Sequence, residues 1–124
     1  MTLRVGLLGY RFMGRAHANA LARLPMFFPD APTVERTVLI GRDRDALDVA
    51  VDTLGFERGV TDWQDALDSI DVLYNLGPNH LHREPSVAAL DRGVHVLCEK
   101  PLANTLGAAE VMADAAADSD ALAG

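Results

Sequence analysis

The sequence predicts an α/β fold: a doubly wound parallel sheet of five strands in the spatial order 3-2-1-4-5, in three layers with helices on both faces. Two observations predict it. Apolar runs alternate with helical patterns along the chain, as in successive βα units, and no repeat or low-complexity linker interrupts them. The 124 residues, 49% hydrophobic and 23% charged, have the size and composition of one globular domain.

The first half of the chain supplies two strand–helix units. The apolar run 3–8 is the first strand, and the turn 9–14 opens a helix that we expect Pro25 to stop. The second unit has its strand at residues 37–40 and its helix at 43–54, ended by the C-cap residue Gly55.

The second half repeats the alternation with shorter elements. Residues 56–60 offer a third strand, and Thr61-Asp62-Trp63-Gln64 resembles a capping box that opens a short helix through Leu67. The remaining elements are strands at 71–76 and 94–98, a helix at 83–92 ended by Gly93, and an alanine-rich helix capped by Asn104 or Thr105 that fades near Asp118. The tail 118–124 carries no clear structural signal.

Charge is distributed unevenly along the chain. The net charge is −7, which disfavours nonspecific nucleic-acid binding. Residues 1–44 hold seven arginines against three carboxylates, and residues 45–124 hold four positive against fifteen negative side chains. The positive N-terminal third is either reserved for an anionic ligand or random scatter. The single cysteine, Cys98, excludes an internal disulfide and suits a reducing cytoplasm, and no apolar run reaches the length of a membrane span.

The first turn resembles a dinucleotide-binding fingerprint, because it follows a strand and opens a helix. The fingerprint has glycine at its first, third and sixth positions, and the third is Arg11 in this chain. A guanidinium there would either displace the phosphates or contact them directly. The turn runs Gly9, Tyr10, Arg11, Phe12, Met13 and Gly14.

The end of the second strand bears on cofactor choice. Enzymes that use NAD place a carboxylate there for the ribose 2′-hydroxyl, and NADP enzymes replace it with a cation. This chain has Gly41 at the position expected to be acidic, followed by Arg42, which favours NADP. Asp43 is close enough to leave NAD open, although it also suits a plain helix cap.

The only lysine, Lys100, lies in Glu99-Lys100-Pro101 at the end of the fifth strand. A lysine can exchange a proton in catalysis and an arginine cannot, so this lone ammonium is a candidate acid–base group. A single lysine that survived by chance in an arginine-biased sequence is the alternative. A metal site is a rival interpretation, although His95 and Cys98 lie inside a strand and are expected to pack; its candidate ligands are His80, His82, His95, Cys98 and Glu99.

Three stretches together resemble the N-terminal domain of the Gfo/Idh/MocA oxidoreductases, the family of glucose-fructose oxidoreductase and inositol dehydrogenase. They are the glycine turn with its following helical histidine (9–17), the Pro-Asn-x-x-His loop (78–82), and the fifth strand that ends in Glu-Lys-Pro (93–101). Their order and spacing agree over essentially the whole chain. The resemblance implies a Rossmann domain that binds NAD or NADP and acts on a sugar, polyol or related hydroxy compound.

The resemblance also implies roles for individual residues. Lys100 would be the catalytic residue that handles the substrate proton, and the other catalytic candidates, Glu99 and His82, would orient it or the ligand. Gly77 stands where relatives often have threonine, so one hydroxyl contact is absent. The residues implied to lie against the cofactor are Gly9, Tyr10, Arg11, Phe12, Met13, Gly14, Gly41, Arg42, Gly77, Pro78, Asn79, His82, Glu99 and Lys100.

Relatives carry a second α/β domain that holds most of the substrate pocket. We therefore expect residues 1–124 to be the dinucleotide-binding domain alone, not competent for turnover by itself. Apolar surface that such a domain would cover could promote homo-oligomers. Two alternatives stay open: a non-catalytic nucleotide-binding or regulatory module, and a truncated remnant without turnover.

Overall fold

The computed structural model describes all residues 1–124 and contains one five-stranded parallel sheet in the order β3-β2-β1-β4-β5. The predicted fold class and strand order are confirmed. The strands are β1 (Thr2–Leu8), β2 (Thr33–Ile40), β3 (Arg58–Val60), β4 (Val72–Asn75) and β5 (His95–Cys98), and the helices are α1 (Phe12–Phe27), α2 (Arg44–Leu54), α3 (Arg83–Asp91) and α4 (Leu106–Asp118).

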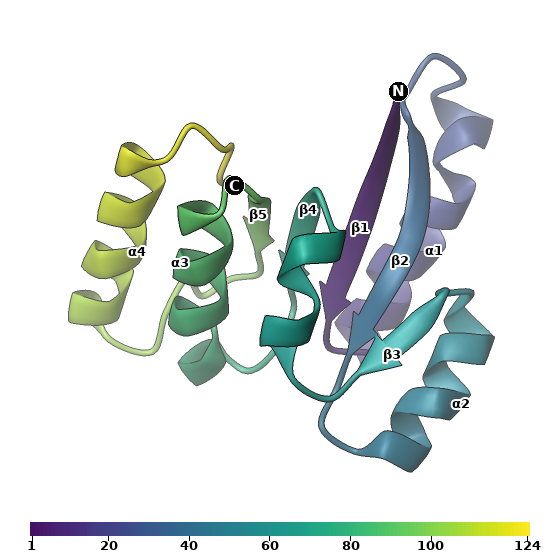
Figure 1. The fold of residues 1–124 in the computed structure, drawn as a ribbon, viewed down its shortest axis with the longest axis horizontal. Helices are drawn as coiled ribbons and strands as arrows, with labels where there is room; N and C mark the ends of the chain where they lie inside the picture. Colours follow the sequence, from purple (N-terminus) through teal and green to yellow (C-terminus); the bar gives the residue numbers. More distant parts are fainter.

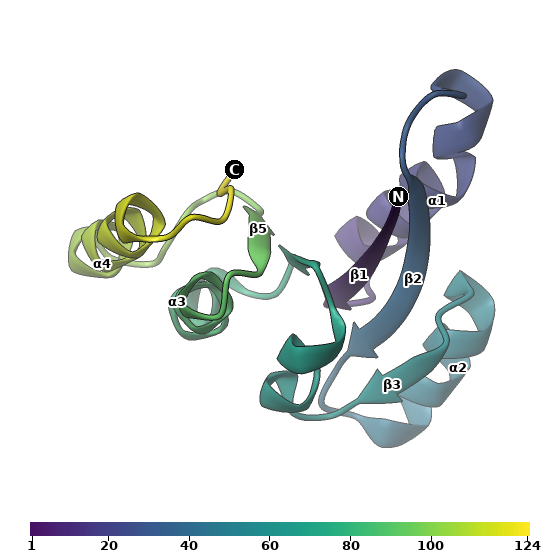
Figure 2. The ribbon, with the colours of Figure 1, turned by 45° about the horizontal axis from the view of Figure 1, so that its top comes forward.

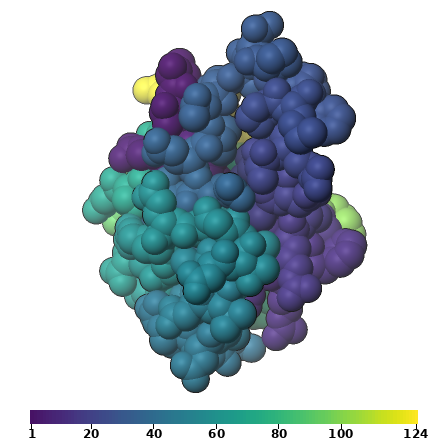
Figure 3. All heavy atoms as spheres, turned by 90° about the vertical axis from the view of Figure 1, so that its right-hand side faces the viewer, coloured from purple at the N-terminus to yellow at the C-terminus, as the bar shows by residue number.

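Helices cover both faces of the sheet. The two ribbon views show α1 and α2 on one side and α3 and α4 on the other (Figures 1 and 2). The two helices of the first side come from the N-terminal half of the chain, whose purple, blue and teal atoms make up most of the surface in the space-filling view (Figure 3). The strand order changes direction between β1 and β4, which is the topological switch point of the sheet. Ligands of such sheets bind beside that point, at the carboxyl ends of the strands.

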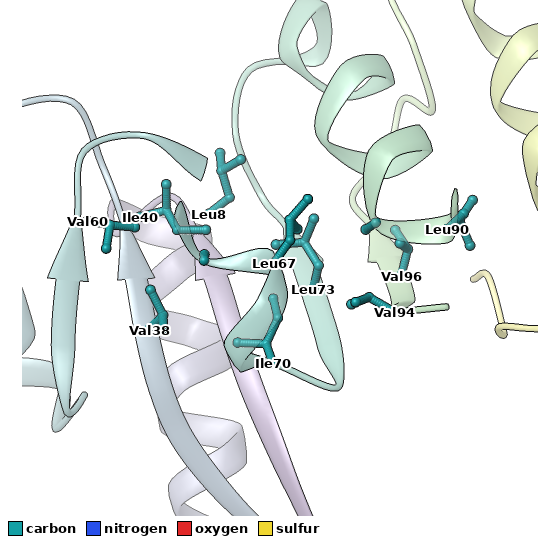
Figure 4. Close-up of a cluster of buried hydrophobic side chains, with 12 residues drawn as sticks. Leu8, Val38, Ile40, Val60, Leu67, Ile70, Leu73, Leu90, Val94 and Val96 are labelled. Atoms are coloured by element: carbon teal, nitrogen blue, oxygen red, sulfur yellow. The ribbon is translucent and has the colours of Figure 1, made fainter. Parts of the chain in front are cut away.

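Two apolar cores hold the three layers together, because side chains alternate between the faces of each strand. Leu7 and Leu39 pack with Leu47 of α2 and Ala18 of α1 on one face. The opposite core lies under α3 and the 3₁₀ turns that precede β4 (Figure 4). It contains Leu8, Val38, Ile40, Val60, Ala66, Leu67, Ile70, Leu73, Ala89, Leu90, Val94 and Val96.

Local capping signals set several of the element boundaries. The Asp43 side chain accepts a hydrogen bond from Ala46 N at 3.1 Å, and Gly55 ends α2 in the left-handed region with φ +71°. Thr105 caps α4 by accepting from Ala108 N at 3.1 Å, which resolves the choice between Asn104 and Thr105. These helix ends are where the sequence predicts them.

Three expectations about elements were wrong. Helix α1 continues past Pro25 to Phe27, because a proline in the last turn removes only one hydrogen bond near the helix end. Strand β2 begins at Thr33 rather than residue 37, since its exposed first half pairs with β1. The segment after β3 forms two 3₁₀ turns rather than one helix, and Asp62 rather than Thr61 caps the first of them.

The C-terminal tail is also ordered against the sheet. Val96 N donates to Leu122 O, and Cys98 N donates to Gly124 O, both at 2.9 Å. A parallel bridge joins Val96 to Ala123. The tail therefore extends the sheet beyond β5, a pairing that its local sequence does not indicate.

Candidate functional site

The glycine turn presents bare backbone at the carboxyl end of β1. Gly9 has φ +103°, a conformation that favours glycine, and a Cβ on Gly14 would overlap the carbonyl oxygen of Gly9. The first hydrogen bond of α1 runs from Arg15 N to Arg11 O, and no side chain caps this end. The preceding amide N–H groups are thus free to bind an anionic oxygen, with the helix dipole favouring negative charge.

The end of β2 lies directly against this turn. A Cβ on Gly41 would overlap the ring of Tyr10 and would lie 2.8 Å from its Cδ1, so the aromatic ring occupies the space of a side chain at position 41. No carboxylate at position 41 fits beside that ring. Arg42 is exposed, and the Asp43 carboxylate is engaged in capping α2.

The loop after β4 is tied to the sheet by Asn75, which is fully buried. Its Nδ2 donates to the carbonyl of His82 at 3.1 Å and to Ser86 Oγ at 3.0 Å, with a longer 3.4 Å contact to the carbonyl of Leu81. Its Oδ1 has no hydrogen-bond partner. Asn75 therefore shapes the 3₁₀ turn Asn79–Leu81, in which Asn79 is exposed at the carboxyl edge of the sheet.

His82 lies beneath the rim rather than on it. The side chain is 1% exposed, and its Nε2 is 2.7 Å from the carbonyl oxygen of Gly77. Its Nδ1 is 3.0 Å from the Pro101 carbonyl oxygen and 3.2 Å from that of Leu102. This position differs from the predicted one among the reacting groups, because both ring nitrogens are engaged by backbone and neither faces the surface.

Glu99 and Lys100 follow β5 at the same edge. Glu99 N donates to Asn75 O at 3.0 Å, which anchors the turn to β4. The Glu99 carboxylate is 3.7 Å from Nε2 of His17, so it lies beside the helix that the glycine turn opens. Lys100 is exposed, and its side chain enters no ion pair of the structure. A free ammonium at this rim can contact a ligand held there.

Two further side chains of the site have perturbed acidity. The pKa of Tyr74, whose ring meets that of His17 edge-on at 5.5 Å, is raised by burial. Burial also raises the pKa of the Cys98 thiol, which faces the carbonyl of Glu99 at 3.6 Å. Both groups therefore stay protonated and neutral at physiological pH, and they line the site as packing groups.

The structure brings most of the predicted residues to one rim, around the carboxyl ends of β1, β2, β4 and β5. Two contributors were missed in the sequence. In the sequence, His17 is only the helical histidine of the motif 9–17, and Asn75 has no predicted role beyond the strand 71–76. The Asn75 signal was present, since a polar amide in an apolar strand requires a buried partner. No three His, Cys, Asp or Glu side chains gather closely enough to hold a metal ion.

Comparison with known proteins agrees with this geometry. Residues 3–123 match the family model of the GFO_IDH_MocA oxidoreductases, described as an oxidoreductase family with an NAD-binding Rossmann fold. The chain belongs to this family. It is an NAD-binding Rossmann domain of the Gfo/Idh/MocA type, as the resemblance in the sequence implies.

Individual relatives are sugar dehydrogenases. The chain is 41% identical to levoglucosan dehydrogenase of Pseudarthrobacter phenanthrenivorans over 121 residues, which are 95% of this chain and 31% of that protein. It is 40% identical to D-xylose 1-dehydrogenase (NADP(+)) 2 of Haloferax volcanii over 70 residues, 55% of this chain and 22% of that protein. Levoglucosan dehydrogenase in complex with NADH and levoglucosan superimposes with a TM-score of 0.94 at 38% identity, over 99% of this chain and 35% of that one.

This Gfo/Idh/MocA chain thus spans about a third of the length of the relatives it matches. None of its helices combines the length and the apolar character that crossing a bilayer requires.

Proposed function

We propose that this chain is the cofactor-binding part of an oxidoreductase that transfers hydride between a nicotinamide dinucleotide and a sugar, polyol or related hydroxy compound. The observation that carries the proposal is the convergence of the glycine turn, the Pro-Asn loop and the Glu-Lys-Pro turn on one rim, seen in the contacts of Glu99 with His17 and of His82 with the Pro101 carbonyl. The sugar-dehydrogenase relatives support the substrate class.

The residues present fit a dinucleotide. The uncapped start of α1 and the bare backbone of Gly9 and Gly14 suit a pyrophosphate, with Phe12 and Met13 in the same turn. We assign Tyr10, Gly41 and Arg42, at the ends of β1 and β2, to the adenosine end of the dinucleotide, and Pro78 and Asn79, after β4, to its nicotinamide end. When bound, the nicotinamide supplies the hydride chemistry, and the chain supplies orientation and a proton donor.

Lys100 is the proposed acid–base residue. Its exposed ammonium can donate to, or its amine accept from, the hydroxyl of a substrate held over the rim. Glu99, held beside His17, would orient that group or the ligand. His82, buried under the same turn, would act through the backbone that follows Lys100.

The cofactor preference that we propose is NADP. Tyr10 fills the space in which an acidic side chain at position 41 would accept the ribose 2′-hydroxyl, and the exposed Arg42 is a cation available to a 2′-phosphate. One relative is complexed with NADH and another is named for NADP, so the relatives do not decide between the two cofactors. The proposed preference for NADP therefore depends on Tyr10, Gly41 and Arg42 alone.

Calorimetric titration with NADPH and with NADH tests cofactor binding by the chain itself. Gly107→Ala is the matched control, because a Cβ at Gly107 meets nothing within 4 Å. We expect saturable binding that the control retains. Absence of binding of either dinucleotide at millimolar concentration, in a protein that melts cooperatively, would contradict the proposal.

Catalysis is tested in a chimaera in which this chain replaces the matching third of levoglucosan dehydrogenase. Lys100→Met should lower turnover about a hundredfold or more while NADH affinity stays near that of the parent chimaera. An active Lys100→Met chimaera would remove Lys100 from the acid–base role.

A non-catalytic nucleotide-binding module is the second candidate, and Arg11 favours it. Its exposed side chain stands at the position where a glycine allows close approach of the pyrophosphate. Markedly tighter dinucleotide binding by Arg11→Gly would support this alternative, since it would show that the native turn has partly lost its role.

A further inference from the structure

Carbonyl oxygens surround both ring nitrogens of His82. Gly77 O lies 2.7 Å from Nε2, and Pro101 O and Leu102 O lie 3.0 and 3.2 Å from Nδ1. The ring is 1% exposed, so water does not compete for either nitrogen. Every partner of the ring is therefore an acceptor.

A neutral imidazole cannot satisfy this arrangement. It has one N–H donor and one nitrogen lone pair, and a backbone carbonyl offers only lone pairs. With the proton on Nδ1, the lone pair of Nε2 would face Gly77 O; with the proton on Nε2, the lone pair of Nδ1 would face two carbonyl oxygens. Each neutral form leaves a repulsive contact in a buried place, where such contacts cost most.

We infer that the His82 ring carries both protons, and that this buried cation is a positioning residue that joins the loop after β4 to the turn after β5. Burying the charge costs free energy, and the three contacts to carbonyl oxygens oppose that cost, because hydrogen bonds from a charged donor are stronger than those from a neutral one. No carboxylate pairs with the ring, because the ion pairs of the structure all involve other residues. The charge is thus compensated by the three carbonyl dipoles.

The His82 ring contacts carbonyls in two loops that belong to the proposed site. Pro101 and Leu102 directly follow Lys100, and Gly77 directly precedes Pro78 and Asn79. One ring therefore sets the spacing between the two loops that the proposed function assigns to the nicotinamide end and the acid–base group. Only this last step rests on the proposed function, since the charge on the ring follows from its hydrogen bonds alone.

Nitrogen NMR of the full chain with ¹⁵N-labelled histidine, at neutral pH, tests the charge state. His82 is assigned by elimination, with single His→Gln substitutions at 17, 80 and 95 removing the other three ring signals, so His82 itself is kept. We expect two slowly exchanging ring N–H groups for His82, one on each nitrogen. A spectrum with one unprotonated His82 nitrogen overturns the inference, whatever the outcome of the cofactor titrations.

Hydrogen exchange tests the positioning role. In His82→Phe, the amides of Leu81 and Glu99, which donate to Pro78 O and Asn75 O in the two loops, should exchange about tenfold faster or more, while amides of β2 and α2 keep their rates. His80→Phe is the control, because His80 is exposed in the same loop and should leave the turn unchanged. Equal acceleration throughout the sheet, or an effect as large in the control, overturns the positioning role. If His82→Phe does not fold, His82→Gln is used. The glutamine amide can donate either to the Gly77 carbonyl or to the carbonyls that follow Lys100, and so keeps one of the two connections.

Discussion

Nε2 of His17 lies 3.7 Å from Oε2 of Glu99, and this contact joins the helix after the glycine turn to the turn after β5. The two side chains are about one quarter exposed, and 82 positions of sequence separate them. Their contact places two of the three motifs in one site. His17 thus contacts Glu99 on one side and meets the Tyr74 ring edge-on.

His17→Gln should therefore weaken cofactor binding more than it weakens the fold. We expect the free energy of unfolding to fall by about 1 kcal/mol or less, as for a partly exposed pair. The dissociation constant for NADPH should rise about two- to fivefold, because Glu99 loses the contact that orients it. Urea unfolding and calorimetry measure the two effects, and Ala20→Gln, on an exposed position of the same helix, is the control. Unchanged affinity would show that the contact is incidental.

The packing of Tyr10 on Gly41 predicts that a methyl group at position 41 would overlap the Tyr10 ring and force it to shift. Gly41→Ala should lower the free energy of unfolding by about 1–3 kcal/mol, the usual cost of overpacking. In a Tyr10→Ala background the same substitution should cost less, because the ring that the Cβ overlaps is gone. Gly107→Ala, in the open first turn of α4, should instead stabilise the protein by about 0.5–1 kcal/mol. Equal costs of Gly41→Ala in both backgrounds would contradict the steric argument.

Arg42→Ala tests the preference for NADP. A guanidinium that contacts a 2′-phosphate is worth about 1.5–3 kcal/mol, so NADPH affinity should fall about ten- to hundredfold while NADH affinity changes little. Arg44→Ala is a matched control, since that guanidinium is engaged by Asp48 at 3.2 Å and by the carbonyl of Gly59 at 3.3 Å. A similar loss for both dinucleotides would remove the preference for NADP.

The sheet and its rim could be predicted because their signals are local. Alternating apolar runs and helical patterns give the strand order, and the caps Asp43, Gly55 and Thr105 are recognised within a few residues of sequence. The motifs fall at strand ends, which a parallel sheet necessarily brings to one edge. These features depend on short segments and on a general rule of topology.

The supporting contacts could not be predicted because they are long-range. Nothing near His82 in the sequence shows that its ring will lie between carbonyls of Gly77 and Leu102. The steric conflict between Tyr10 and position 41 spans two βα units, and the pairing of the tail with β5 depends on a free sheet edge. Such contacts require the packed structure, and they determine whether a rim residue is exposed for chemistry or buried for support.

Asp71 provides a pH-dependent test of the sheet that carries the rim. Its carboxylate accepts hydrogen bonds from the backbone N and the guanidinium of Arg4, at 2.8 to 3.1 Å, and these bonds lower the pKa of Asp71. A carboxyl group whose pKa is lower in the folded than in the unfolded protein stabilises the fold above its ordinary pKa. That stability is lost as the pH falls through the lowered value.

Asp71→Asn should therefore lower the free energy of unfolding at neutral pH. The difference in the free energy of unfolding between the variant and the parent protein should shrink as the solution is made strongly acidic. Urea unfolding at neutral and acidic pH measures the difference, and Asp52→Asn, at an exposed position of α2 that enters no ion pair, should show neither effect. A cost of Asp71→Asn that stays constant across this range would mean that the charge of Asp71 is not its source, and no cost at either pH would mean that the backbone bond alone, which an asparagine can also accept, joins β1 to the start of β4. The pH dependence thus separates the charge of Asp71 from its place in the hydrogen-bond network.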